Sequence, residues 1–153
     1  MTNFAYPIEK IANKFIELAA EQGRLLTHLQ LQKLIYFAHG LSLGLNSRRL
    51  VANNFHAWPY GPVSPQLYDE LKIYRDRAID KPLEDPMPEL DLDDEANRVV
   101  KDIFKVYGHH SGFKLRDISH VSGSPWSEID SREKYGVIPD SLTETYYKKV
   151  LKG

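Results

Sequence analysis

Hydrophobic residues recur every three or four positions along much of this chain, which is the spacing of amphipathic helices. Residues 8–22 carry one apolar stripe, and Pro7 just before it suits the first turn of a helix. Residues 28–45 are apolar around most of the helical circumference, and Thr27 with Gln30 has the spacing of a capping box. Because a helix that is apolar nearly all round is a buried one, we predict that this second helix forms the centre of the fold.

The helical periodicity breaks after this segment. Asparagine tolerates the left-handed backbone of tight turns, so Asn53-Asn54 predicts a small β-hairpin near residues 50–58, with residues 50–51 as its first strand. Pro59 and Pro62 each disfavour helix at the residue before them. We therefore expect an extended and stiff chain through this proline-rich stretch.

The remaining helices are predicted from the same periodicity, together with Ser-Pro and Ser-x-x-Glu start signals. They cover residues 64–78, 94–107, 111–121 and 141–151. Residues 126–140 show no clear pattern and are predicted to be mostly irregular. The predicted fold class is mainly α: a single domain, residues 1–153, in which five to six helices form a compact bundle around the central helix at residues 28–45, with at most one small β-hairpin near residues 50–58.

The composition narrows the function classes. Lys and Arg total 20 and Asp and Glu total 21, a balance that argues against non-specific nucleic-acid binding, which depends on neutralising phosphates. The chain has no cysteine, so disulfides and thiolate chemistry are excluded. No apolar run has the length of a membrane span, and no basic and apolar leader is visible. We expect a cytoplasmic protein that has no membrane partner.

The charge is uneven in one place. Seven acidic residues and no basic ones lie between Pro82 and Glu95. A solvated loop leading into a helix explains such a run, because acidic side chains favour the first turn of a helix. A contact surface for a basic partner is the alternative.

The sequence offers little for catalysis. His109 and His110 are adjacent and would point apart on a helix, so they lack the spacing of a zinc-binding pair. Ser119, His120 and Asp117 could supply a catalytic trio, but no Gly-x-Ser-x-Gly elbow accompanies them. No glycine-rich phosphate loop is present. We therefore predict no catalytic residue, no metal site and no cofactor.

Two groups of residues are candidates for partner binding. Gln32, Tyr36 and His39 share one side of the predicted central helix. They are either core-edge residues whose polar tips find hydrogen bonds or the lining of a groove. The second group, Trp58 and Tyr60, lies among prolines, and Trp126 follows Ser124-Pro125 in the same way. These aromatic residues either pack on the core or form exposed anchors, since Trp and Tyr dominate binding hot spots.

Three sequence blocks carry a resemblance to a known family. They are Leu-Gln-Lys-Leu-Ile-Tyr-Phe-Ala at 31–38, Phe-His-Ala-Trp-Pro-Tyr-Gly-Pro-Val at 55–63, and Ser-His at 119–120 followed by Pro-Trp at 125–126. In these blocks the chain resembles the Panacea domain of SocA-like antitoxins, which also occurs in phage-associated proteins of the GepA type. The middle block is the most specific, because its aromatic residues, prolines and glycine are uncommon and occur in order.

The resemblance implies a mainly helical protein that neutralises a cognate toxin by direct protein–protein binding. A variant of this role is an adaptor that delivers the toxin to a cellular protease. The resemblance transfers no catalytic residues, and it fills most of the chain, so no separate DNA-binding domain is expected. The competing hypothesis is a small enzyme with a polar groove around Tyr36, His39 and Tyr60. The candidate partner-binding residues are Gln32, Tyr36, His39, Trp58, Tyr60, His120 and Trp126; the oligomeric state is left open.

Overall fold

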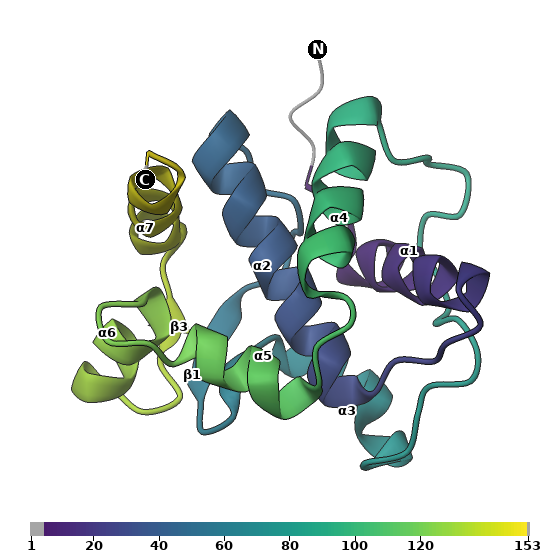
Figure 1. The fold of residues 1–153 in the computed structure, drawn as a ribbon, viewed down its shortest axis with the longest axis horizontal. Helices are drawn as coiled ribbons and strands as arrows, with labels where there is room; N and C mark the ends of the chain where they lie inside the picture. Colours follow the sequence, from purple (N-terminus) through teal and green to yellow (C-terminus); the bar gives the residue numbers. More distant parts are fainter. Residues whose placement is uncertain (1–4, 153) are drawn as a thin grey trace.

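Helices dominate residues 5–152, which is the part of the chain that this computed structural model describes (Figure 1). The helices are α1 Ile8–Glu21, α2 His28–Asn46, α3 Pro65–Leu71, α4 Asp94–Tyr107, α5 Gly112–Ser119, α6 Pro125–Arg132 and α7 Asp140–Leu151, with the 3₁₀-helix η1 Lys72–Tyr74. The strands are β1 Phe55–Trp58, β2 Gly61–Val63 and β3 Val137–Ile138. The predicted mainly α fold class is confirmed.

The second helix, α2, runs through the middle of the molecule, with α7 on one side and α4 with α1 on the other (Figure 1). It contacts α1, α3, α4, α5, α7 and β2, and it is buried along most of its length. Its N-terminus has the predicted capping box, in which Thr27 and Gln30 bond each other's backbone N–H groups. The prediction of a central buried helix is therefore confirmed.

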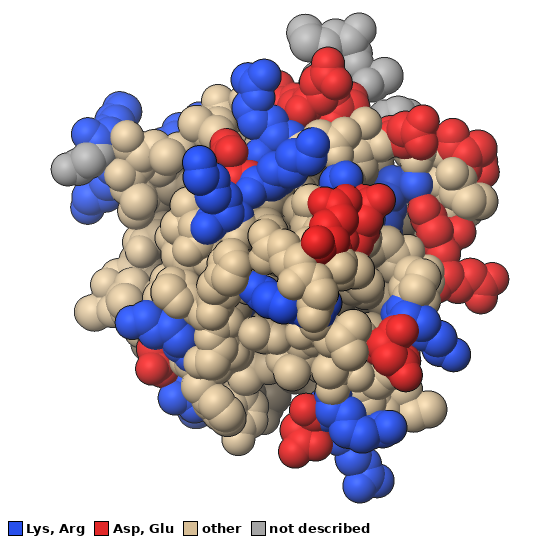
Figure 2. Space-filling model, turned by 45° about the vertical axis from the view of Figure 1, so that its right-hand side comes forward, with Lys and Arg blue, Asp and Glu red and all other residues tan. Residues whose placement is uncertain are grey.

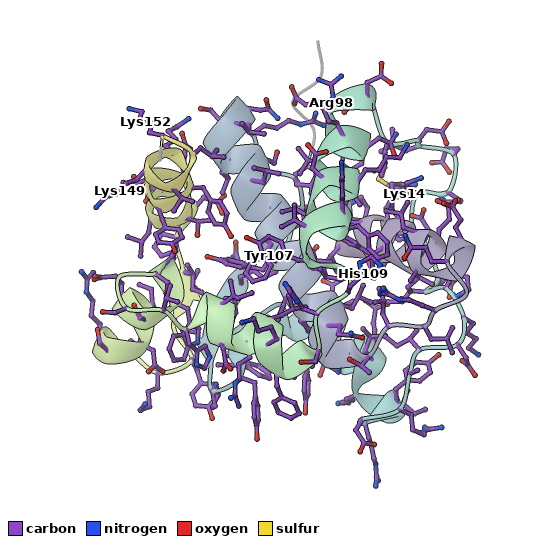
Figure 3. The ribbon with its side chains drawn as sticks, in the orientation of Figure 1. Lys14, Arg98, Tyr107, His109, Lys149 and Lys152 are labelled. Atoms are coloured by element: carbon purple, nitrogen blue, oxygen red, sulfur yellow. The ribbon has the colours of Figure 1, made fainter. Side chains whose placement is uncertain are left out.

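The main core lies where α2 meets α1 and α4. Phe15 of α1 packs near Phe104 of α4, with ring centroids 6.5 Å apart, and both belong to one continuous cluster of buried apolar residues. Tyr107, at the end of α4, lies over α2 (Figure 3), and its ring centroid is 5.1 Å from that of Phe37. Among the described helices, none is long and apolar enough to cross a membrane.

Two glycines of α2 allow α7 to approach closely. A Cβ atom at Gly40 would lie 2.3 Å from Cε2 of Tyr147, and one at Gly44 would lie 2.8 Å from Cβ of Tyr147. Glycine is a poor helix former, so two glycines on one face of a central helix lower its intrinsic stability. The packing of Tyr147 against the bare backbone of α2 offsets this loss.

The small sheet differs from the predicted hairpin. β1 pairs antiparallel with both β2 and β3, in the order β2-β1-β3, whereas Val51 forms only an isolated parallel bridge with Tyr6. The prediction that residues 50–51 form the first strand of the hairpin was wrong. The turn lies instead at Pro59 and Tyr60, because proline suits the second position of a tight turn and Gly61, at φ +109°, accepts a backbone that other residues avoid.

Residues 126–140 were wrongly predicted to be irregular. Ser124 caps α6 by accepting a hydrogen bond from the N–H of Ser127, and Pro125 occupies the first turn. This is the same Ser-Pro signal that starts α3 at Ser64. The short helix is stabilised by a small second cluster, in which Ala57, Ile129 and Ile138 are buried and Trp126 and Leu142 pack against them.

Several helix boundaries also differ from the prediction, and two apolar residues of the fifth segment are exposed. The third helix ends at Leu71, and after η1 the chain turns at Arg75, whose φ of +56° is left-handed. The last helix starts at Asp140, and its N-cap residue is Pro139, whose side chain has no hydrogen-bond acceptor. The predicted Ser141–Glu144 capping box does not form, and Glu144 accepts a hydrogen bond from Ser47. In the fifth segment, Phe113 and Val121 are exposed, so their apolar character does not mark the core face.

The acidic segment between Pro82 and Glu95 is partly neutralised within the chain. Asp85 pairs with Lys10 at 2.7 Å, and Arg48 pairs with Asp93 at 2.9 Å and Glu95 at 3.0 Å. Acidic side chains gather on the side of the molecule where this segment runs (Figure 2). Three of the seven carboxylates therefore pair with basic side chains of the same chain. A contact between the other four carboxylates and a basic partner stays a prediction.

The close packing at Gly40 can be tested by adding a methyl group. We expect Gly40→Ala to lower the free energy of unfolding by about 1–3 kcal/mol, because the new Cβ overlaps the Tyr147 ring. Urea denaturation measures the loss. In a Tyr147→Ala background the same change should instead stabilise the protein by up to about 1 kcal/mol, since alanine is the better helix former. Equal losses in both backgrounds would contradict the proposed packing.

Candidate partner-binding site

The seven candidate residues fall into two groups in the structure. Gln32, Tyr36 and His39 lie on α2 and are almost completely buried, with 1–3% of each residue exposed. The other four lie around the β1–β2 hairpin and the adjacent start of α6.

Gln32 joins α2 to the start of α3. Its amide oxygen accepts a hydrogen bond from the N–H of Ser64 at 2.9 Å, and its amide nitrogen donates to the carbonyl of the same residue at 3.2 Å. The amide nitrogen also lies 3.1 Å from Nε2 of His28. Gln32 thus satisfies both backbone groups of Ser64 at the point where the chain leaves β2 and enters α3.

Tyr36 and His39 join α2 to the last helix. The Tyr36 hydroxyl shares a hydrogen bond of 3.2 Å with Oγ1 of Thr143, and burial raises the pKa of this phenol above its usual range. Nδ1 of His39 accepts from the N–H groups of Leu50 and Val51, so its Nε2 carries the proton and donates to Asp140 at 3.0 Å. Burial lowers the pKa of His39, which keeps the imidazole neutral.

These contacts do not form the polar groove of the competing enzyme hypothesis. Tyr36 and His39 point from α2 toward α7 and residues 50–51, whereas Tyr60 lies in the hairpin turn and 57% of it is exposed. The pocket that Tyr60 lines includes neither of the other two. Among the described residues, no cluster of three or more His, Asp or Glu could hold a metal ion.

The second group is held together by Trp126. Its indole Nε1 donates a hydrogen bond of 2.7 Å to the carbonyl of Trp58, which ties the start of α6 to the hairpin. The His120 ring stacks on Trp126, with centroids 3.7 Å apart and planes 6° from parallel. Burial lowers the pKa of His120, and the charges of Arg116 and Lys33 act in the same direction. His120, Trp126 and Trp58 therefore form one packed unit of partly buried residues.

Further aromatic side chains extend this unit into a surface. The Trp58 ring lies 5.0 Å from the Tyr68 ring and 5.9 Å from the Tyr135 ring. Tyr60, Tyr68, Phe113 and Tyr135 are all exposed large side chains. We call Trp58, Tyr60, Tyr68, Phe113 and Tyr135 the aromatic surface; it lies at the end of the molecule where α3, α5 and β1 meet (Figure 1). Sequence analysis identified only its first two members.

Two pockets open on either side of Pro59 within this surface. The larger has a volume of about 250 Å³ and is walled by Trp58, Tyr60, Tyr68 and Phe113. The other, of about 240 Å³, lies between Trp126 and Tyr135. The hairpin turn is thus a ridge between two hollows, a shape that can engage a complementary protein surface.

Lys33, which sequence analysis overlooked, lies beneath the larger pocket. Its side chain is fully buried, and Nζ donates a hydrogen bond of 2.9 Å to the carbonyl of Pro62. A Cβ atom at Gly61 would lie 2.6 Å from Cε of Lys33 and 2.7 Å from Oγ of Ser119, and the φ of +109° strains other residues, so glycine suits the passage of the strand over the lysine. Burial lowers the pKa of Lys33 to about 7. The signal was present in the sequence, because a lysine inside the apolar run 31–38 must be buried with the helix.

His28 is the second buried basic residue at this pocket. Burial, with the nearby charge of Lys33, lowers the pKa of His28 to about 4. The imidazole is therefore neutral at physiological pH, and its ring lies 5.3 Å from that of Tyr68. Lys33 is therefore the buried basic group at this pocket whose protonation changes near neutral pH.

Comparison with known proteins adds independent information. The family model described as "Antitoxin SocA-like, Panacea domain" matches residues 31–127, which include the three sequence blocks and four of the five residues of the aromatic surface. The chain is 34% identical over 130 residues to Antitoxin SocA of Caulobacter vibrioides, covering 78% of this chain and 68% of that protein. No solved structure matches the chain.

The buried state of Lys33 predicts a specific pH dependence of stability. The pKa of Lys33 is about 7 in the folded chain and about 10.5 when unfolded, so between these values the unfolded state binds more protons and stability rises with pH. We expect the free energy of unfolding to rise between pH 7 and pH 9 by up to about 1.4 kcal/mol per pH unit from this one group. Lys33→Met should abolish the rise.

The matched control is Lys101→Met, which removes an exposed lysine from α4. This variant should keep the wild-type slope in urea denaturation over the same pH range. A wild-type protein whose stability is flat from pH 7 to pH 9 would show that the amine is hydrated or paired in the folded state.

Proposed function

The chain belongs to the SocA-like antitoxin family that carries the Panacea domain, and from this premise we propose that it neutralises a toxin by binding it directly through the aromatic surface. The toxin would be met in the cytoplasm. This role requires no catalytic residue and no cofactor from the chain. Its selectivity would come from the shape and charge of the surface.

The observation that carries the proposal is an exposed set of aromatic side chains on a rigid support. Isolated exposed apolar residues are common, but a contiguous patch of them marks an interaction site. Here Trp58 and Tyr60 belong to a hairpin whose turn is fixed by Pro59, so little conformational entropy is lost when a partner binds. Tyr and Trp bury a large area with few rotatable bonds, which is why they dominate hot spots.

The buried candidates have a supporting role in this proposal. Gln32 holds the junction of β2 and α3, and the indole N–H of Trp126 holds the carbonyl of Trp58. Tyr36 and His39 anchor α7 on the far side of α2. Replacing any of these would alter neutralisation through folding, whereas replacing Tyr60 would alter the contact itself.

Co-expression is the direct test of the function. The chain and the product of the neighbouring open reading frame are expressed from separate inducible promoters. We expect the neighbour alone to arrest growth, co-expression to restore it, and the two proteins to purify together as a stable complex. Restored growth without a complex would contradict direct binding. If the neighbouring gene product expressed alone does not arrest growth, it is not the toxin of this antitoxin. A fall in toxin level that depends on a cellular protease would distinguish the adaptor variant from sequestration.

The proposed contact predicts the effect of Tyr60→Ala. Because more than half of Tyr60 is exposed, its loss should leave the melting temperature unchanged. Affinity for the toxin should fall by about 2 kcal/mol, the scale of a hot-spot aromatic residue. Calorimetric titration of the purified pair measures this.

Val106→Ala is the control for Tyr60→Ala, because Val106 is 62% exposed on α4, away from the aromatic surface. It should bind the toxin as the wild type does. Trp58→Ala is expected to reduce both stability and affinity, since the ring packs against Tyr68 and Tyr135. If Tyr60→Ala binds with wild-type affinity, the contact lies elsewhere on the protein.

The charge distribution supports a protein partner and not DNA. Of the cations labelled in Figure 3, Lys14 lies on α1, Arg98 near the start of α4, Lys149 on α7 and Lys152 just after α7. Affinity for DNA depends on several clustered phosphate contacts. We expect no shift of the promoter DNA of its own gene in a gel assay with the free protein at physiological salt. A shift at nanomolar protein would contradict this.

A further inference from the structure

The larger pocket of the aromatic surface has a chemistry of its own. We propose that it receives an acidic segment of the partner protein, with an apolar side chain between the aromatic walls and a neighbouring carboxylate held by Arg75 above the buried Lys33. This inference rests on the proposed function and adds the chemical character of the bound segment. It is argued from the walls, the charge and the size of the pocket.

The walls favour an apolar side chain. Trp58, Tyr60, Tyr68 and Phe113 surround the opening, and Leu29 and Val63 complete the apolar lining. Tyr68 is held from two sides, by the Trp58 ring at 5.0 Å and the His28 ring at 5.3 Å. A flat or branched apolar group entering here would be enclosed by aromatic faces whose positions are already fixed.

The charge of the lining has one sign. Lys33 and Arg75 both line the pocket, and none of its lining residues is Asp or Glu. The Lys33 ammonium donates to a single carbonyl although it has three N–H groups, and within residues 5–152 the Arg75 guanidinium has no ion-pair partner. Arg75 is always protonated, and Lys33 is protonated below its pKa of about 7, so a lining without a carboxylate gives the pocket a positive potential at neutral pH and below.

The local backbone adds to this potential. His28 and Leu29 belong to the first turn of α2, and Phe113 belongs to the first turn of α5. The N-terminal turns of two helices, where the helix dipole is positive, therefore border the same pocket. Arg75 reaches the rim from a left-handed backbone conformation, φ +56°, which non-glycine residues seldom adopt.

The size of the pocket suits a side chain better than a free metabolite. Its volume of about 250 Å³ is below the range of about 300–1,000 Å³ that is common for small-molecule sites. It is continuous with the exposed aromatic surface, so a chain lying across Tyr60 and Phe113 could place one residue inside. The chemistry of the site therefore matches a peptide segment in which large apolar residues are flanked by acidic ones.

Short peptides test this inference without the toxin. The probes are acetylated and amidated hexapeptides: Asp-Glu-Leu-Phe-Glu-Asp, its uncharged counterpart Asn-Gln-Leu-Phe-Gln-Asn, and the basic Lys-Lys-Leu-Phe-Lys-Lys. Each is titrated into the isotope-labelled full chain, and binding is followed by NMR. We expect the acidic peptide to shift the resonances of Lys33, Tyr60 and Phe113 and to bind about tenfold or more tightly than the uncharged one, the factor expected for one charge-assisted pair.

Arg75→Gln is the diagnostic variant, because Arg75 is exposed and outside the core. It should remove most of the preference for the acidic peptide and leave binding of the uncharged peptide unchanged. Arg98→Gln is the matched control; Arg98 is an exposed arginine at the opposite end of the molecule from α3 (Figure 3), and its loss should change neither affinity.

The outcomes separate failure of the pocket proposal from failure of the proposed function. Equal affinities for the three peptides, or no shift of the pocket resonances at millimolar peptide, would contradict the proposal that an acidic segment binds here. Toxin neutralisation would still be tested by co-expression. Stronger binding of the basic peptide would show that the pocket does not select negative charge. If the acidic peptide binds as expected but the neighbouring gene product forms no complex, the pocket's preference for acidic segments is supported and the proposed function is contradicted.

Discussion

The structure depends on one constraint: α2 is buried on almost every side yet carries polar side chains, each of which must find a hydrogen-bond partner inside the protein. Gln32 bonds Ser64, Lys33 bonds Pro62, and Tyr36 bonds Thr143. The surrounding segments come from distant parts of the sequence. Because an unpaired buried polar group costs about 1–3 kcal/mol, these bonds fix where each segment docks along the helix.

This arrangement explains why the candidate site is rigid. The bonds from Gln32 and Lys33 fix β2 against α2, and the bond from Trp126 fixes β1 against α6. The hairpin turn between the strands therefore projects from a support that is held at both sides. Its exposed aromatic residues are already held in place, so little conformational entropy is lost when a partner binds, as a preorganised binding surface requires.

The same physics favours the proposed binding role over the alternative of a small enzyme. A catalytic site brings ionisable groups with altered pKa values into a cleft where substrate can reach them. In this chain His39 is buried and its two ring nitrogens are both engaged in bonds that hold neighbouring segments. The exposed surface carries aromatic rings, with Arg75 at its rim and the buried Lys33 beneath, which suits recognition of another chain.

The amino-acid pattern alone predicted most of the helices and the buried central one, because helical periodicity and capping depend on residues only a few positions apart. It predicted α2 with its capping box, the α4 stripe and the family that the three blocks indicate. Only the tertiary structure decided which strand pairs with Phe55–Trp58, which partner each polar group of α2 finds, and that Tyr68, Phe113 and Tyr135 join Trp58 in one surface. These outcomes rest on contacts between residues far apart in the chain, and no local pattern encodes the distance between them.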